Sequence, residues 1–198
     1  MKGVMLPAFY QLFDYANPKT ICEIGTHDAK SAVQFIDYCV KLNRDVKYFG
    51  YDIFDAVKDN KKFHVKEING KGAGNYSKAK ANLDHRTRKY KFFKYKLFRG
   101  YTQDTLKESS YDFVYIDGGH SYETVKHDYN KVKNSKVIVF DDYQTDGVKK
   151  FFDELVKKDL LPEVPWPECF YYTNTCCSFL PKTSSKHIQV TILNREET

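Results

Sequence analysis

The chain has 198 residues, of which 41% are hydrophobic and 29% charged, with a mean hydropathy of −0.62. This length allows one domain with a sizeable core. No apolar run approaches the roughly 20 residues that span a bilayer, and the first residues lack the long apolar core of a signal peptide. We therefore expect a single domain over residues 1–198 in the cytoplasm, with no membrane partner.

The chain is basic, with a formal net charge of +6 and a sequence pI of about 8.9. A basic balance can serve nucleic-acid binding. The lysines, however, are spread along the whole chain, with local density over residues 58–66 and 86–96. This spread favours a solvated lysine-rich surface over a nucleic-acid interface, and it leaves a small anionic substrate open as a partner.

The five cysteines are odd in number and show no metal-knuckle spacing. Cys22 lies in an apolar run and Cys39 in a segment with helical spacing, so we expect buried free thiols. Free thiols are typical of a reducing compartment such as the cytoplasm.

The predicted elements alternate between strands and helices. A short helix is expected first, over about residues 5–16. Apolar runs then predict strands over Thr20–Ile24, Val46–Ile53, Lys94–Arg99, Phe113–Ile116 and Lys136–Phe140. Apolar residues at helical spacing predict helices over Lys30–Leu42, Tyr76–Arg88, Tyr122–Val132 and Asp146–Lys158. The alternation predicts an α/β fold, a doubly wound and mostly parallel sheet with helices on both faces.

Two segments depart from this rhythm. Residues 55–75 form a polar, glycine-containing stretch that is long for a loop, so we expect a lid or an acceptor wall there. Near the end of the chain, strands are expected over Cys169–Tyr172, Cys177–Leu180 and His187–Leu193. No helix separates these strands, so at least one of their pairs should be antiparallel.

Polar or glycine residues follow every predicted strand. They are Glu23-Ile24-Gly25-Thr26, Asp52, Gly100-Tyr101-Thr102, Asp117-Gly118-Gly119-His120 and Asp141-Asp142-Tyr143. In open parallel sheets, ligands bind at the carboxyl ends of the strands. These residues therefore predict one site at one edge of the sheet.

The first two strands indicate a nucleoside site. Gly25 lets a ligand approach the backbone, and the helix after it offers free N–H groups to an anionic group. Asp52, at the end of the second strand, can accept hydrogen bonds from both hydroxyls of a ribose. The turn has only Gly25 and lacks the G-x-G-x-x-G pattern, which disfavours a pyrophosphate-binding loop and an NAD-dependent enzyme.

These residues also carry a family resemblance. The pattern Glu23-x-Gly25-x-x-x-Ala29-x-Ser31 resembles motif I of the class I S-adenosylmethionine-dependent methyltransferases, except that Ala29 stands where that family usually has glycine. YDFVYIDGGHSYETVKHDY and VIVFDDY resemble its small-molecule O-methyltransferase branch, which includes macrocin-type sugar methyltransferases. The similarity covers roughly Lys19 to Leu155. It implies a Rossmann-like sheet of seven strands with an antiparallel C-terminal strand.

The resemblance implies S-adenosylmethionine as the cofactor. Its methionine end would lie beside Gly25 and Thr26, with the carboxylate near Ser31 and the ribose on Asp52. The adenine would lie near Tyr101 and Thr102, with Asp117 also in the cofactor site. Glu23 would orient the amino group or the loop itself, and an acid that only fixes the loop or caps the helix is the alternative.

A hydroxyl acceptor must lose a proton during methyl transfer. Three acids at one sheet edge, Asp117, Asp141 and Asp142, suit Mg²⁺ or another divalent cation, which the matching acids bind in the resembled branch. Neighbouring strand residues point to opposite faces, so Asp141 and Asp142 share an ion only if the strand has ended there. His120 is the expected catalytic base, because the ordinary pKa of histidine suits proton transfer near neutrality. Asp117 is expected beside it as a second catalytic residue. A helix-capping residue or a metal neighbour is the alternative for His120.

The sequence thus predicts a methyltransferase that acts on a hydroxyl of a small molecule or sugar, with a divalent metal as a possible aid. A metal-dependent relative of the same fold that does not transfer methyl groups is one alternative. A non-catalytic module that docks nucleic acid or protein is another. The oligomeric state is left open.

Overall fold

A computed structural model describes residues 13–56, 67, 72–143 and 145–157, together with the backbone of 171–172, 175–176, 179–181 and 189–193. Residues 13–16 are helical, and the rest of the expected N-terminal helix lies outside the described residues. Of the segment 55–75, residues 55, 56, 67 and 72–75 are described. No helix in these described ranges is long and apolar enough to cross a membrane.

The centre of the fold is a parallel sheet of five strands. The strands are β1 (Thr20–Ile24), β2 (Val46–Asp52), β3 (Phe93–Arg99), β4 (Phe113–Ile116) and β5 (Val137–Asp141). They are ordered β3-β2-β1-β4-β5, and each neighbouring pair is parallel. The order reverses beside β1, where doubly wound sheets bind their ligands. The predicted α/β class and the parallel sheet are confirmed.

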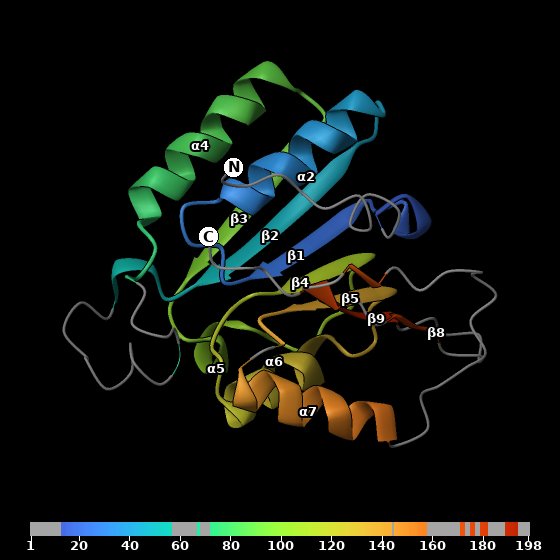
Figure 1. The fold of residues 1–198 in the computed structure, drawn as a ribbon. Helices are drawn as coiled ribbons and strands as arrows, with labels where there is room; N and C mark the ends of the chain where they lie inside the picture. Colours follow the sequence, from blue (N-terminus) through green and yellow to red (C-terminus); the bar gives the residue numbers. More distant parts are fainter. Residues whose placement is uncertain are drawn as a thin grey trace.

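Helices cover both faces of this sheet (Figure 1). They are α2 (Lys30–Lys41), α4 (Tyr76–Lys89), α5 (Thr102–Thr105), α6 (Tyr122–Val132) and α7 (Asp146–Lys157). Figure 1 shows α2 and α4 on one face and α6 and α7 on the other. A short 3-10 helix, Phe54–Ala56, follows β2.

The central strands β1, β4 and β5 are mostly apolar because both sides of the sheet are buried there, as is usual for parallel sheets. Along β4, Phe113 and Tyr115 belong to the hydrophobic cluster under α2 and α4, whereas Val114 and Ile116 belong to the cluster under α6 and α7. All four side chains are buried. Cys22 and Cys39 are buried free thiols, as the sequence predicted.

Four short strands lie near the end of the chain. They are β6 (Tyr171–Tyr172), β7 (Thr175–Cys176), β8 (Phe179–Pro181) and β9 (Gln189–Leu193). β9 lies parallel beside β5, β8 is antiparallel to β9, and β6 pairs with β7. The segments between these strands lie outside the described residues. The established fold is the five-stranded parallel part, and the sheet of seven strands with an antiparallel C-terminal strand stays a prediction.

Candidate functional site

A cavity of about 350 Å³ opens at the carboxyl edge of the parallel strands. This size suits a small-molecule ligand. The expected site residues that line it are Gly25, Thr26, Ser31, Asp52, Tyr101, Thr102, Asp117, His120, Asp141 and Asp142. The sheet edge therefore brings together residues from the ends of all five parallel strands.

The turn after β1 places backbone against backbone. Gly25 has φ +95°, and a Cβ atom there would lie 1.8 Å from the carbonyl oxygen of Asp117. Only glycine fits this conformation and this close approach. The Gly25 N–H donates to the carbonyl oxygen of Tyr51 over 2.8 Å. The loops after β1, β2 and β4 are thus fixed against one another at the floor of the cavity.

Helix α2 begins with an open N-terminus. Its N-cap residue, Ala29, has φ 62° and offers no side-chain hydrogen bond to the first turn. The first amides of a helix without such a cap are available to a ligand, and the helix dipole favours a negative group there. Ser31, in this first turn, lines the cavity. The start of α2 can therefore bind a carboxylate.

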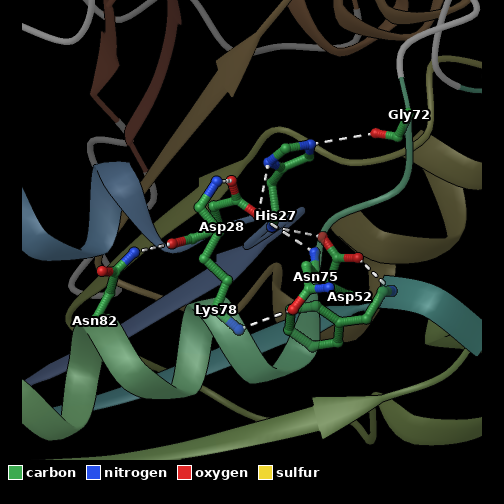
Figure 2. Close-up of polar contacts among 8 residues, drawn as sticks. His27, Asp28, Asp52, Gly72, Asn75, Lys78 and Asn82 are labelled. Atoms are coloured by element: carbon green, nitrogen blue, oxygen red, sulfur yellow. Dashed lines mark hydrogen bonds and ion pairs between the residues drawn. The ribbon is translucent and has the colours of Figure 1, made fainter.

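Asp52 ties the turn after β1 to the end of β2. Its carboxylate accepts hydrogen bonds from the backbone N–H of His27 over 2.6 Å and of Phe54 over 2.5 Å (Figure 2). Burial raises the pKa of Asp52, although these two amides oppose the rise. A carboxylate has about four lone-pair sites, so two remain for the hydroxyls of a ligand.

The loop of His27 and Asp28 is braced from outside by α4 (Figure 2). The Asp28 carboxylate pairs with Lys78 Nζ at 2.6 Å and accepts the N–H of Asn75 at 3.3 Å. Its backbone carbonyl accepts Asn82 Nδ2 at 2.9 Å. Burial alone would raise the pKa of Asp28, but the hydrogen bonds from Lys78 and Asn75 lower it below its ordinary value. This acid was not among the expected site residues, although it lies within the motif and lines the cavity.

Glu23 lies outside the cavity lining. It is buried in β1 and accepts a hydrogen bond from the Tyr48 hydroxyl. Burial raises the pKa of Tyr48, and the Glu23 carboxylate raises it further, so this hydroxyl stays a donor. The same hydroxyl lies 3.3 Å from Thr26 Oγ1. This placement agrees with the alternative in which Glu23 fixes the loop.

A buried acid lies at the end of the cavity where Tyr101 and Thr102 were expected to hold an adenine. Asp128, on α6, is fully buried and lines the cavity. Burial raises its pKa, while hydrogen bonds from Thr102 and His127 oppose the rise. Asp128 lies one helical turn after Thr124, which also lines the cavity. Helical spacing therefore places both residues on the same face of α6. Asp128 was not among the expected site residues, although this spacing can be read from the sequence.

The three acids expected to bind a metal do not form a ready ion site. Asp141 accepts hydrogen bonds from the Tyr115 hydroxyl and from the N–H of Asp142. Asp142 pairs with His120, from its Oδ2 atom to Nε2 at 2.8 Å. Among the described residues, no group of three or more His, Cys, Asp or Glu side chains could hold a metal ion. Asp141 and Asp142 are thus engaged with protein groups, and the described residues form no site for the expected cation.

Glu67 is a second residue that the sequence did not single out. It is buried and lines the cavity. Its backbone carbonyl accepts the N–H of His120 at 2.8 Å, and its carboxylate accepts the N–H of Ser121 at 3.2 Å. A Cβ atom at Gly119 would lie 2.7 Å from Glu67 Oε2 and equally near Thr124 Cγ2, so both side chains lie close to this turn. No periodicity marks Glu67 in its polar segment, and only the fold shows this contact.

The cavity is acidic although the chain is basic. Its described lining holds seven carboxylates, on Asp28, Asp52, Glu67, Asp117, Asp128, Asp141 and Asp142. Lys30 is the single lysine or arginine in that described lining, and it lies at the start of α2. The lining therefore favours a ligand with positive charge or with many hydrogen-bond donors.

The parallel sheet, the glycine turn after its first strand and the acid after its second define a Rossmann-like α/β domain with a ligand cavity at the switch point. Residues 22–143 match the profile of a family described as "Methyltransferase domain". The match covers more than half of the chain, and the protein belongs to this methyltransferase family. The resemblance to class I S-adenosylmethionine-dependent methyltransferases that we drew from the residues is thereby confirmed.

Among solved structures, the O-methyltransferase TomG from Streptomyces achromogenes, involved in tomaymycin synthesis and in complex with SAM, is similar to this chain. The alignment covers 94% of this chain and 78% of TomG, with 14% identity and a TM-score of 0.47. No curated protein matches the sequence. Likeness at this level transfers no residue roles.

Proposed function

We propose that the protein is an S-adenosylmethionine-dependent methyltransferase that acts on a hydroxyl group of a small molecule, with a sugar as the leading acceptor class. One observation supports this most directly. Gly25, the open start of α2 and the Asp52 carboxylate all line one cavity. Membership of the methyltransferase family selects S-adenosylmethionine from the nucleosides that such a cradle could hold.

The residues present fit this cofactor from end to end. Gly25 lets the Asp117 loop pack against the turn after β1 at the floor of the cavity, and the first turn of α2 with Ser31 would hold the carboxylate of the methionine part. Asp52 would bind the ribose hydroxyls, and Tyr101 and Thr102 would lie at the adenine. The acidic lining suits the positively charged donor.

When bound, the cofactor supplies an activated methyl group for in-line displacement. The protein then has two tasks: to align the acceptor hydroxyl and to receive its proton. His120 lines the cavity and is nearly buried, and we propose it as the base. Asp117 would lie beside the reacting groups, because its loop contacts Gly25 directly.

We derive no step through a divalent cation. The carboxylates of Asp141 and Asp142 are engaged with Tyr115 and His120 in this structure. A requirement for Mg²⁺ stays a prediction of the sequence, to be tested by assaying turnover with and without a chelator.

The test of the proposed function is calorimetric titration with S-adenosylhomocysteine, followed by an acceptor screen. Saturable binding that Asp52→Ala weakens at least tenfold supports the cradle. Transfer of a labelled methyl group to a sugar or other hydroxyl compound supports the reaction. If the folded protein binds no adenosyl compound, the proposal is wrong.

A further inference from the structure

His120 and Asp142 form a buried pair at the wall of the cavity. They lie 22 residues apart, after β4 and β5, and their side chains are only 8% and 9% exposed. His120 Nε2 lies 2.8 Å from Asp142 Oδ2. A carboxylate only accepts, so a hydrogen on Nε2 is the one that could bond across this contact.

The other ring nitrogen of His120, Nδ1, is buried and has no hydrogen-bond partner among the described residues. In the neutral imidazole, one nitrogen donates and the other accepts. With the hydrogen on Nε2, the lone pair is on Nδ1. The contact with Asp142 therefore favours this tautomer of His120.

Asp142 has an unfavourable backbone conformation, which its hydrogen bonds hold in place. Its φ is 56°, in the left-handed region that non-glycine residues rarely adopt. Its carbonyl oxygen accepts both the N–H and the hydroxyl of Thr145, at 2.9 and 2.8 Å, and its own N–H is bound to Asp141 Oδ1. Strain that the surroundings hold in place is often found at functional positions.

The backbone of His120 is fixed as firmly as its ring. Its N–H donates to the carbonyl oxygen of Glu67. The first turn of α7 packs closely against the His120 backbone, since a Cβ atom at Gly147 would lie 2.2 Å from the His120 carbonyl oxygen. The histidine is thus positioned before any acceptor arrives, and a preorganised base needs little rearrangement during the reaction.

We propose that Asp142 is the positioning residue of a His120–Asp142 dyad and not a metal ligand, and that Nδ1 of His120 receives the acceptor proton. This inference rests on the proposed function. As the acceptor oxygen forms its bond to the methyl carbon, the carbon–sulfur bond breaks and its electron pair stays on sulfur. The hydroxyl proton moves to Nδ1, and Asp142 stabilises the imidazolium through Nε2–H.

The test reads the tautomer directly, in the full chain with S-adenosylhomocysteine bound. Long-range ¹H–¹⁵N spectra of the histidine rings, with the His120 signals assigned by His120→Gln, should show hydrogen on Nε2 in the wild type. Asp142→Asn should shift His120 from this state, because the negative charge of the carboxylate is lost. Asparagine is the suitable replacement because it tolerates the left-handed backbone. Asp146→Asn, the same chemical change at an exposed residue four positions later, should leave the His120 signals in place.

Two further measurements decide between the dyad and a metal site. Mn²⁺ should cause no broadening of the His120 signals that depends on Asp142. Once a turned-over acceptor is known, Asp142→Asn should lower kcat by about tenfold or more with little change in KM, and a chelator should leave the wild-type rate unchanged.

Hydrogen on Nδ1 in the wild type would overturn the dyad. So would Mn²⁺ broadening that Asp142→Asn abolishes, or a chelator-sensitive rate that Mg²⁺ restores. Failure of S-adenosylhomocysteine to bind would instead refute the proposed function, so the two failures are distinguishable.

Discussion

At the scale of single residues, the site depends on a few positions with no freedom to change. Gly25 is the clearest, because its φ of +95° and its contact with the Asp117 carbonyl oxygen exclude any side chain. Asp52 is the second, because one carboxylate both fixes two loops and faces the cavity.

Gly25→Ala should be strongly destabilising. The strained backbone and the overlap with Asp117 together should lower the free energy of unfolding by about 2–5 kcal/mol. Urea denaturation checks this. Gly72→Ala is the matched control, since a Cβ at Gly72 meets nothing within 4 Å, and it should change the stability by less than about 0.5 kcal/mol. Equal effects of the two substitutions would contradict the described turn.

Asp52 predicts the pH dependence of cofactor binding. Burial raises its pKa, so in the free protein it takes up a proton at a higher pH than an ordinary aspartate does. A protonated carboxyl accepts ribose hydroxyls less well, and the affinity for S-adenosylhomocysteine should therefore fall with acidification, beginning above the ordinary range near about pH 4. Titrations between neutral and acid pH measure this. Asp52→Asn should bind more weakly and with a flatter profile, and an unchanged profile would count against the ribose role.

At the scale of elements, the part of the cavity formed by Gly25, the start of α2 and Asp52 depends on packing between neighbouring elements. The loop of His27 and Asp28 is held by the first turns of α4, where the Asn75 side chain also caps the helix by accepting the N–H of Lys78 at 2.9 Å. Helix α4 therefore supports the cavity although none of its residues is in the described lining.

Asn75→Ala should lower the free energy of unfolding by about 1 kcal/mol through loss of the cap. It should also weaken binding of S-adenosylhomocysteine, because the start of α4 positions Asp28. Denaturation and calorimetry measure the two effects. Asn75→Ser should retain most of the stability, since serine caps as well as asparagine. If alanine and serine behave alike, the cap has no role in stability.

The elements of the parallel part were predictable because their signals are local. The apolar runs Thr20–Ile24 and Phe113–Ile116 became β1 and β4 with the same bounds. The glycine and acids at strand ends met at one edge because parallel strands require it. Pairings between distant residues had no such signal. Neither the contact of Asp142 with His120 nor the bond from Tyr115 to Asp141 can be seen in spacing, and these two pairings engage two of the three acids expected to bind a metal.

At the scale of the whole molecule, charge is divided unevenly. The chain has a net charge of +6, yet seven carboxylates and one lysine line the described cavity. The surface lysines therefore do not indicate the charge of the ligand. The acidic lining gives little support to an anionic acceptor, which the basic sequence had left open.

The acidic cavity predicts a difference between donor and product. S-adenosylmethionine carries one more positive charge than S-adenosylhomocysteine, so its attraction to the carboxylates should be the more sensitive to salt. Calorimetry at low and high NaCl should show a larger loss of affinity for the methionine form. Equal salt dependence would mean that the carboxylates do not face the sulfur.

The central claim is that this cavity binds an adenosyl cofactor through Gly25, the start of α2 and Asp52. The most direct measurement is calorimetric titration of the protein with S-adenosylhomocysteine and with NAD, in the wild type and in Asp52→Ala. The account predicts saturable, one-to-one binding of the first compound, at least tenfold weaker in the variant, and no comparable binding of NAD. Binding of NAD without S-adenosylhomocysteine, or adenosyl binding that Asp52→Ala leaves unchanged, would contradict it.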